Sequence, residues 1–504
     1  MSNQKQIVKN TIFLYLRMIL SMGVSLYTSR VILNILGIAD YGIYNVVGGI
    51  IVMFSFINNA MSGTSSRFIT YELGLEKGNV QRIFSATLTI HLAIAIFILL
   101  LGETIGVWFL NNKLVIPENR MTDAMWLYQF TVISSFFTIT QVPYNSSIIA
   151  HERMNVYAYV EIVNVCLKLC IVLSLKLFVK NRLIIYGFMI MLASILIMSI
   201  YRWYCMKEFK HCKFSLCFNK SVILPILKFS GWDSYAMVGI IGRTQGIGLI
   251  LNIFFTATIN AATGIALQVQ TAVMSLTNNI TTAFRPQIIK QYASSNPFES
   301  CKLIIISAFF TSLILLMISM PLIIFMPVVL KIWLNLVPNY AVEFCRLVLI
   351  FCFINNLVNV VMIGVHTYGK NKFTSIIIGT IDIFILPATY ILFKFKLNPL
   401  IPYMLVIITE FIILISCVLI LNHYIKEFSI GIFLKKVILR LLIIVSCTGI
   451  PILYISSYLT HNLWGLLELV ALVIFTLCAS TYLLLSQNER NKINYILKNI
   501  KKKA

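Results

Sequence analysis

Long apolar runs recur along the whole chain and constrain its fold more than any other feature. The run 303–326, for example, holds no charged side chain. A helix needs roughly 20 mostly apolar residues to cross a bilayer, and in lipid it pairs its backbone polar groups internally. The sequence therefore predicts an all-α polytopic membrane protein with about 14 transmembrane helices. The predicted spans are residues 10–33, 42–64, 84–107, 125–148, 155–178, 183–206, 228–253, 258–281, 302–326, 343–366, 373–395, 400–421, 437–459 and 464–485.

The composition supports this class and excludes others. Hydrophobic residues make up 59% of the 504 residues and charged residues only 11%, whereas soluble proteins carry about 25% charged residues. A soluble enzyme is therefore excluded. We attribute the net charge of +23 to basic loops facing anionic lipid, so no nucleic-acid partner is expected.

The cysteines give little sign of a disulfide framework or a metal site. Their number, 11, is odd, and most of them lie in apolar runs, which argues against paired disulfides. One loop places His211, Cys212 and Cys217 together. A single sparse cluster of this kind does not predict a metal site. No cofactor is expected either.

Lys and Arg side chains are unevenly distributed between the predicted loops. Loops after even-numbered spans carry most of them, as in Lys207, Lys210 and Lys213. Cytoplasmic loops are enriched in these residues. Both termini are therefore expected in the cytoplasm.

The chain contains traces of an internal repeat. Residues 33–35 (LNI) recur at 251–253, and Arg67 matches Arg285, both at an offset of 218. Residues 207–209 (KEF) recur at 426–428, at an offset of 219. Each copy would hold six spans, so the two copies are expected as parallel repeats about an axis along the membrane normal. The predicted organisation is a first lobe at 1–206, a basic cytoplasmic linker at 207–227, a second lobe at 228–424, two further spans within 425–485 and a basic cytoplasmic tail at 486–504.

Polar residues gather in spans 1, 2, 7 and 8, which correspond in pairs by the repeat. Unpaired polar groups are costly in hydrocarbon, so these helices are expected to face protein or water. One interpretation is that the amides hydrogen-bond between helices. The other is a hydrated central cavity. The residues predicted to line it are Asn58, Asn59, Gln245, Gln268 and Asn278.

Three arginines lie within predicted spans, at Arg17, Arg30 and Arg243. Arginine stays charged in proteins, so a deep one must pair or face water. Its planar donors suit phosphate, which makes all three candidates for binding an anionic substrate. The alternatives are a structural pair between Arg17 and Asp233, and extension of Arg30 to the outer interface.

Carboxylates within spans are candidates for ion coupling, because they can take up and release protons inside a helical bundle. Glu161 shares one helical face with Lys168, so a structural pair is an equal alternative there. The full set of candidates is Asp233, Glu161, Asp382 and Glu410. No nucleotide-binding or metalloprotease motif occurs. No catalytic residue is assigned, and the protein is not expected to be an enzyme.

Several segments of the chain carry a recognisable pattern. In the second half they are 229–233 (FSGWD), 243–246 (RTQG), 251–255 (LNIFF), 260–269 and 285–293. In the first half they are 29–37, 40–46 and 67–74. These segments resemble bacterial polysaccharide flippases of the Wzx type, in the multidrug/oligosaccharidyl-lipid/polysaccharide (MOP) superfamily. The resemblance covers most of the chain and is densest at 229–293.

This resemblance implies a MATE-like fold of 14 helices in the bacterial inner membrane. It also implies a flippase that moves undecaprenyl-diphosphate-linked oligosaccharides outward by alternating access, for O-antigen, capsule or exopolysaccharide. The implied partners are the lipid-linked anionic glycan, a coupling proton or sodium ion, membrane lipids and other polysaccharide-assembly proteins. The cationic cavity role falls on Arg17, Arg30 and Arg243.

Two other functions compete with this one. A drug or cation antiporter of the same superfamily would favour an acidic cavity, whereas the polar spans carry more Arg than Asp or Glu. A membrane-embedded polysaccharide polymerase or ligase would need a large outer loop for its chemistry. The longest predicted outer loop, near 110–123, is short.

Overall fold

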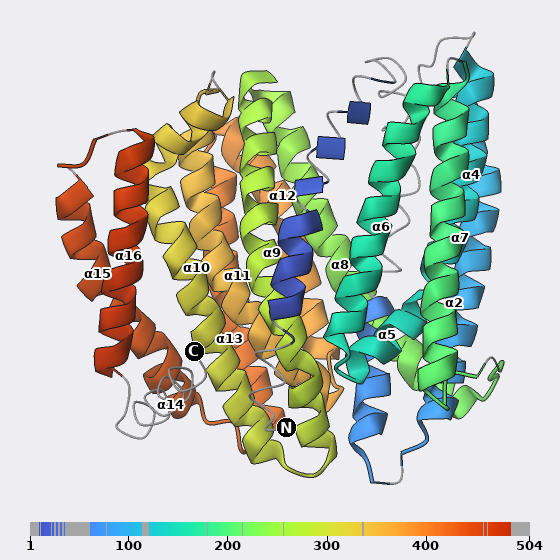
Figure 1. Cartoon of the computed structure of the whole chain (residues 1–504). Coiled ribbons are helices and arrows are strands. Elements are labelled where there is room, and N and C mark those ends of the chain that lie inside the picture. Colours follow the sequence, from blue (N-terminus) through green and yellow to red (C-terminus); the bar gives the residue numbers. More distant parts are fainter. Residues whose placement is uncertain are drawn as a thin grey trace, which may run out of the picture. The chain divides into compact units, whose positions relative to one another are not determined.

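A computed structural model describes most of residues 10–484, and every regular element in this described part is a helix. The residues left undescribed are 1–9, 11, 22, 25–26, 29–30, 33–34, 36–60, 77, 113–119, 179, 214, 256, 335–336, 457, 461 and 485–504. The longer helices run roughly alongside one another within each group of Figure 1. The all-α class predicted from the apolar runs is confirmed.

The helices follow the predicted spans closely. Helical residues are found at 12–21 in the first predicted span and at 61–74, a stretch that overlaps the end of the second predicted span and continues past it. The elements of the first half are then α2 (Val80–Leu101), π-helical η1 (Gly102–Gly106), α3 (Val107–Asn112), α4 (Met121–Thr140), α5 (Val142–Ala150), α6 (Met154–Ser174), η3 (Leu175–Leu177) and α7 (Arg182–Glu208). The second half holds α8 (Lys220–Phe254), α9 (Ala257–Ala293), α10 (Pro297–Leu334), α11 (Ala341–Tyr368), α12 (Lys372–Lys394) and α13 (Ile401–Tyr424). The chain continues with α14 (Ile430–Phe433), π-helical η4 (Leu434–Leu439), α15 (Arg440–Ser456) and α16 (Leu463–Leu484).

Nine helices within the described part are long and apolar enough to cross a membrane. Helices α8 and α9 are not among them, although they run for 35 and 37 residues. Both are long enough to span a bilayer, and both carry the amides and hydroxyls that the sequence places in spans 7 and 8. When the more polar helices are counted with these nine, the structure fits the predicted set of about 14 spans.

Contacts divide the chain into two compact units. Unit 1 comprises Met1–Val238, Thr282–Ser300 and His366–Gly379, and unit 2 comprises Gly239–Thr281, Cys301–Val365 and Thr380–Ala504. In unit 1, α4 packs against α2 and α7, and α6 packs against α7. Phe84, Tyr144 and Tyr201 are fully buried among these helices. In unit 2 a large cluster of buried side chains is centred on α11.

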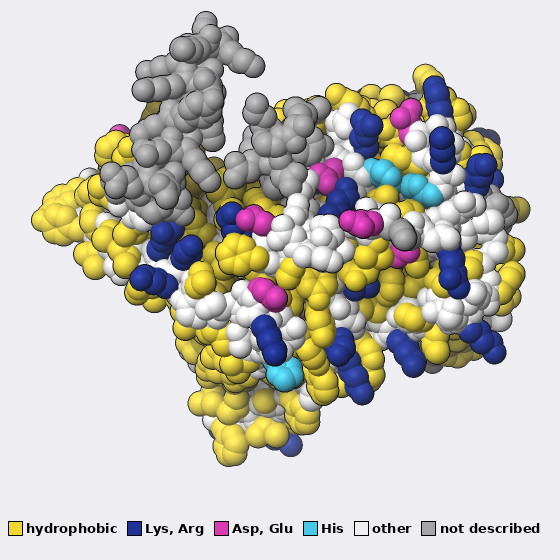
Figure 2. All heavy atoms as spheres, turned by 90° about the horizontal axis from the view of Figure 1, so that it is seen from below, with side chains coloured by type: hydrophobic (Ala, Val, Ile, Leu, Met, Phe, Trp, Pro, Cys, Tyr) yellow, Lys and Arg dark blue, Asp and Glu magenta, His cyan; other side chains and the backbone are white. Residues whose placement is uncertain are grey.

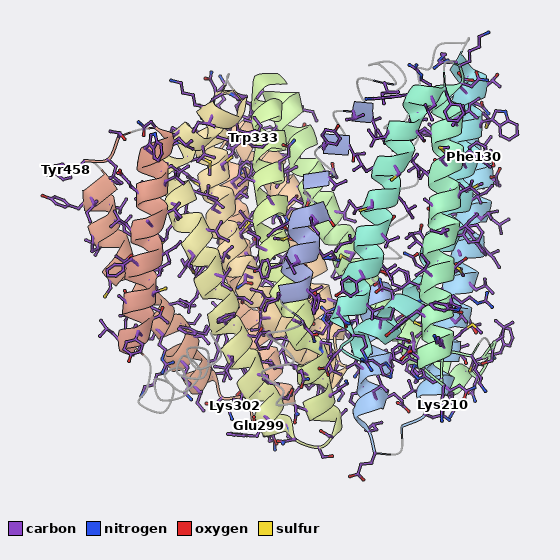
Figure 3. All side chains as sticks on the ribbon, in the orientation of Figure 1. Phe130, Lys210, Glu299, Lys302, Trp333 and Tyr458 are labelled. Atoms are coloured by element: carbon purple, nitrogen blue, oxygen red, sulfur yellow. The ribbon has the colours of Figure 1, made fainter. Side chains whose placement is uncertain are left out.

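Charged and aromatic side chains mark the ends of several helices. Figure 3 shows Lys302 and Trp333 at opposite ends of α10. In unit 1, Lys207, Lys210 and Lys213 are exposed where α7 ends and the linker begins. Figure 2 shows Lys and Arg side chains on the face that is seen from below. The cytoplasmic position of the linker stays a prediction.

Helix α10 contains a kink with an identifiable cause. Phe325 departs from helical geometry, with φ −96° and ψ 19°, between Pro321 and Pro327. Pro327 lacks an N–H, so it cannot pair with the carbonyl of Ile323 one turn earlier. Arg346 of α11 replaces that donor, and its Nε lies 2.8 Å from the Ile323 oxygen. A side chain of the neighbouring helix therefore satisfies the carbonyl that the kink leaves without its backbone donor.

Left-handed residues recur at equivalent places in the two halves. Glu152 (φ 60°) follows α5 and Gly369 (φ 87°) follows α11, and these positions are 217 residues apart. Asn181 (φ 57°) precedes α7 and Lys396 (φ 59°) follows α12, 215 residues apart. These spacings are close to the offset of the sequence matches. They support the proposed duplication, which stays a prediction.

Candidate functional site

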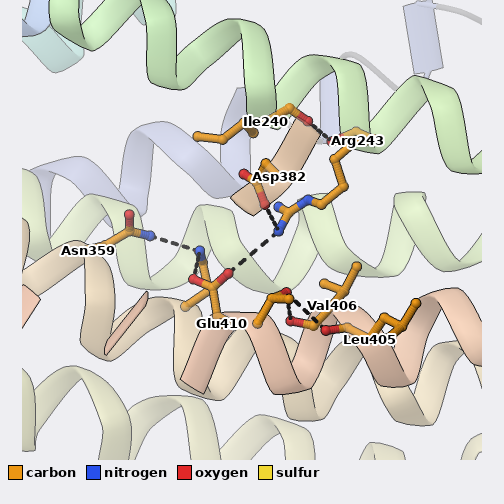
Figure 4. A network of polar contacts seen from close by, with 10 residues as sticks. Ile240, Arg243, Asn359, Asp382, Leu405, Val406 and Glu410 are labelled. Atoms are coloured by element: carbon orange, nitrogen blue, oxygen red, sulfur yellow. Dashed lines mark hydrogen bonds and ion pairs between the residues drawn. The ribbon is translucent and has the colours of Figure 1, made fainter. Parts of the chain in front are cut away.

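A buried polar network in unit 2 joins three helices (Figure 4). Arg243 comes from α8, Asp382 from α12 and Glu410 from α13. Arg243 Nη1 lies 3.0 Å from Asp382 Oδ1 and 3.5 Å from Glu410 Oε2. The three side chains are only 7%, 1% and 3% exposed. One guanidinium nitrogen therefore contacts two buried carboxylates.

Helix α11 completes the network. Asn355 Nδ2 donates to Glu410 Oε1 at 2.8 Å, and Asn359 Nδ2 donates to Asn355 Oδ1 at 2.9 Å. The Arg243 guanidinium also lies over the Phe351 ring, 5.1 Å from its centroid. Both Glu410 oxygens thus face a donor, while the aromatic ring covers the cation.

Close packing of α8 on α12 brings Arg243 to Asp382. A Cβ built on Gly246 would lie 2.6 Å from Leu386 Cδ2, so only a glycine fits without movement. Gly246 lies one turn after Arg243, and Leu386 lies one turn after Asp382. The two helices are therefore closely packed one turn away from the ion pair.

The charges in this network do not balance. With both carboxylates ionised, the network carries one positive and two negative charges. A buried, uncompensated carboxylate is costly, so the site favours uptake of a proton or a small cation. Asp382 holds the shorter contact with Arg243, and Glu410 the longer one. The network is neutral when one of its two carboxylates carries a proton.

Asp233 lies in unit 1 with a different set of partners. Its Oδ1 accepts hydrogen bonds from Asn371 Nδ2 at 2.6 Å and from Ser375 Oγ at 3.4 Å. His366 Nε2 lies 3.4 Å from the same oxygen. The sequence offered Arg17 as a partner for Asp233, but the contacts seen here come from α11, α12 and the turn between them. Arg17 instead places its guanidinium 4.9 Å from the centroid of the Tyr157 ring.

The remaining predicted site residues are dispersed. Glu161 accepts a hydrogen bond from the Tyr201 hydroxyl at 3.0 Å, within unit 1. Gln245, Gln268 and Asn278 are exposed on α8 and α9, in unit 2. The predicted candidates that lie outside the described residues are Arg30, Asn58 and Asn59. Within the described part, no group of three or more His, Cys, Asp or Glu side chains could hold a metal ion.

Sequence reasoning missed contacts between the first and second halves inside unit 1. Arg67 Nε donates to the His366 carbonyl at 2.8 Å, and its Nη2 donates to the Thr367 carbonyl at 3.2 Å. Glu152 accepts hydrogen bonds from Gln287 and from Lys290 Nζ, the latter at 2.8 Å. The sequence marks Arg67 as a repeat match and as the start of the flippase-like segment 67–74, and assigns it no contact. Its position at the end of a polar span was the available signal for a capping role.

Asn355 was also missed, although a signal was present. Asn355, Asn356 and Asn359 stand in an otherwise apolar run. Three amides at this spacing in a buried span need partners. Asn356 finds them in Thr311 and Ser312 of α10, at 3.0 and 3.1 Å from its Nδ2.

Comparisons with known proteins identify the fold. No protein-family model matches the chain. No curated protein matches it by sequence. Among solved structures, it is similar to an outward-facing multidrug-resistance MATE family transporter of the MOP superfamily, with a TM-score of 0.73 and 12% identity over 85% of this chain and 97% of that one. It is also similar to a MATE transporter in a bent conformation, with a TM-score of 0.70 and 13% identity over 85% of this chain and 96% of that one.

A third structure shows that pocket charge differs within this superfamily. It is a MOP superfamily transporter from Pyrococcus furiosus, described as having a binding pocket of reverse polarity that suggests a different function. Its TM-score is 0.65, with 13% identity over 84% of this chain and 96% of that one. At such identities the likeness shows the fold alone. The chain is a multi-pass membrane protein with the fold of MATE transporters.

Proposed function

We propose that this chain is an ion-coupled exporter that moves polyprenyl-diphosphate-linked oligosaccharides to the outer leaflet of the bacterial inner membrane. The MATE transporter fold supports export by alternating access. The flippase-like segments, densest at 229–293, support the lipid-linked glycan as the substrate. The charge imbalance among Arg243, Asp382 and Glu410 is the observation that carries the ion coupling.

In this mechanism Glu410 alternates between a protonated and an ionised form. When it is protonated, Arg243 and Asp382 form a neutral pair, and the buried site carries no net charge. When it is ionised, the site is negative and draws Arg243 toward both carboxylates. Because the three residues belong to α8, α12 and α13, a change of protonation alters the preferred packing of these helices. Proton uptake and release can thereby bias the conformational cycle.

This mechanism divides the cationic residues between two tasks. The charge of Arg243 is committed to Asp382 and Glu410, so it serves the coupling site. Contact with the diphosphate then falls to the other intramembrane arginines, Arg17 and Arg30. Arg17 is only half-buried, and its guanidinium lies 4.9 Å from the centroid of the Tyr157 ring. A hydrated arginine compensates the solvation that a diphosphate loses on leaving water.

A drug or cation antiporter is the second candidate, and the fold supports it equally. The relatives with the same fold include a multidrug-resistance transporter. A buried site with excess negative charge would also suit proton-driven drug export. The two functions differ in substrate, so the deciding experiment must measure both.

The experiment is deletion of the gene in its host, followed by complementation with the wild type or with Glu410→Gln. We expect deletion to remove surface polysaccharide and to accumulate lipid-linked oligosaccharide, with no change in drug tolerance. The wild type should restore export and Glu410→Gln should not, at equal protein abundance. Normal polysaccharide with increased drug sensitivity after deletion would favour the antiporter.

A further inference from the structure

The linker that follows α7 runs along helix α2 as an extended segment. Ser215 Oγ and Ser85 Oγ share a hydrogen bond of 2.6 Å, and the Cys217 N–H donates to Thr89 Oγ1 at 2.9 Å. The Thr89 hydroxyl donates its own proton to the Ser85 carbonyl at 2.8 Å, so its oxygen is oriented to accept from the linker. Two alternate linker residues, 215 and 217, therefore face α2.

The residues next to them point the other way. In an extended chain, successive side chains lie on opposite sides. Leu216 and Phe218 are accordingly exposed, Phe218 to 74%, whereas Ser215 and Cys217 are half-buried. Two large apolar side chains therefore lie on the outer side of the linker.

The first turns of α8 are apolar on their outer face as well. Val222, Ile223 and Ile226 pack in a cluster with residues of α2. The exposed large side chains of these turns are Leu224 and Leu227. A surface helix of a protein in water has a polar outer face, whereas a helix that is apolar on all sides is surrounded by protein or lipid. The start of α8 thus has the character of a helix that contacts lipid.

Helix α2 shows that this surface lies beside the membrane. Ser85 and Thr89 belong to the stretch Val80–Asn112, which is long and apolar enough to cross a membrane. Thr89 lies about 14 Å along the helix from Val80. A backbone N–H in lipid needs a partner within the protein, and the Thr89 hydroxyl provides one for Cys217. The linker segment at 215–218 therefore lies against an apolar span, where Leu216 and Phe218 can reach acyl chains.

The same segment is strongly cationic. Residues 209–232 contain four Lys and no Asp or Glu. Lys213, Lys220 and Lys228 are exposed, and the last two share one face of α8 with the exposed Leu224 and Leu227. We call the exposed side chains of residues 213–228 the linker surface. Its apolar groups and ammonium groups are complementary to a lipid that carries acyl chains and an anionic headgroup.

We propose that the linker surface binds anionic phospholipids of the adjacent leaflet. Leu216 and Phe218 enter the acyl region together with the exposed leucines of α8. The ammonium groups of Lys213, Lys220 and Lys228 hold the headgroup phosphates. The linker is then an anchored interfacial segment, whatever substrate the protein exports.

The test measures lipid binding by the full-length protein. Delipidated protein in a neutral detergent is titrated with phosphatidylglycerol or phosphatidylcholine, and bound lipid is measured by native mass spectrometry. Lys220→Gln should weaken phosphatidylglycerol binding roughly fivefold. Combining it with Lys213→Gln and Lys228→Gln should abolish the preference for phosphatidylglycerol. Phe218→Ser should weaken binding of both lipids, because they share the acyl chains.

The matched control removes three exposed lysines elsewhere, near the ends of α10 and α12. Lys331, Lys394 and Lys396 are exposed, and their combined Gln variant loses the same charge as the linker variant. It should keep the affinity and the preference of the wild type. Melting temperatures exclude misfolding, and Lys220→Gln carries the test alone if the combined linker variant is unstable.

Several results would overturn the proposal. Equal binding of the two lipids by the wild type would show that the headgroup charge is not recognised. Equal losses in the linker and control variants would attribute binding to net charge alone. Unchanged binding by Phe218→Ser would show that the acyl chains lie elsewhere. Displacement of phosphatidylglycerol by inorganic phosphate would assign the lysines to a soluble anion instead.

Discussion

Asn355 donates a hydrogen bond of 2.8 Å to Glu410, the carboxylate that lies farther from Arg243. Asn355→Leu removes this donor and leaves one Glu410 oxygen unsatisfied in a buried site. A buried acceptor without a partner costs about 1–3 kcal/mol. We therefore expect a lower melting temperature for Asn355→Leu, measured by a fluorescence thermal shift.

The same variant in a Glu410→Leu background provides the control. Once the carboxylate is absent, loss of Asn355 should have a smaller effect than in the wild type. A double-mutant cycle over the two positions measures this coupling. Additive effects would show that the hydrogen bond contributes nothing to stability.

Arg243 is expected to be essential for stability as well as for transport. Arg243→Ala leaves Asp382 and Glu410 buried without a cation, at a cost of about 3–5 kcal/mol. We expect low abundance of this variant in membranes, measured by quantitative immunoblotting. The triple variant Arg243→Ala, Asp382→Asn, Glu410→Gln should recover abundance but not export. Normal abundance of Arg243→Ala alone would contradict the ion-pair network.

The kink of α10 predicts a compensating pair of substitutions. Arg346→Leu leaves the Ile323 carbonyl without a donor and should destabilise the protein by about 1–3 kcal/mol. Adding Pro327→Ala restores a backbone N–H that can pair with Ile323, so part of the stability should return. Thermal unfolding in detergent measures both steps. Lys331→Ala, at an exposed position of the same helix, is the control and should be neutral.

Gly369 should not tolerate a side chain. Its φ of +87° is unfavourable for other residues, and a Cβ there would collide with the Arg67 guanidinium. Gly369→Ala is therefore expected to lower the melting temperature and to weaken the contacts of Arg67 with the end of α11. Gly431→Ala is the matched control, because its nearest neighbour would be 3.8 Å away. Equal effects of the two variants would refute this explanation.

The buried imidazole of His151 should make the stability of the protein depend on pH. Burial lowers the pKa of His151 to about 4, from an ordinary value of 6.5. Between these two values the unfolded chain binds more protons than the folded one, so stability is complete above about pH 6.5 and falls as the pH drops toward 4. His151→Gln should reduce this decline, as measured by thermal unfolding across that range. An equally steep decline in His151→Gln would refute this explanation.

Much of the fold could be predicted from the sequence because the governing signal is local. Each apolar run reports its own insertion into the bilayer, and the described helices match the runs. The polar character of α8 and α9 was also visible in their amides. The prediction of Asp382 and Glu410 as candidates depended only on their depth in apolar runs.

The partnership of those residues could not be predicted in the same way. Arg243, Asp382 and Glu410 meet because three helices distant in sequence adopt particular rotations and depths, which side-chain packing decides. The contact between Gly246 and Leu386 is one example of such packing, because a Cβ at position 246 would overlap the Leu386 side chain. For Asp233, depth alone suggested Arg17, whereas neighbouring helix ends supply the partners seen here.

The bond between Arg67 and Thr367 has a consequence for biosynthesis. Its two ends are separated by 300 residues, so a ribosome working at roughly 5–20 residues per second needs roughly 15–60 s to supply the second after the first. During that interval Arg67, which is only 8% exposed in the finished protein, has no access to the carbonyls that later receive it. Until α11 has been synthesised, the Arg67 guanidinium of the nascent first half therefore needs other hydrogen-bond acceptors. Water, lipid phosphate or an insertion factor has to provide these acceptors.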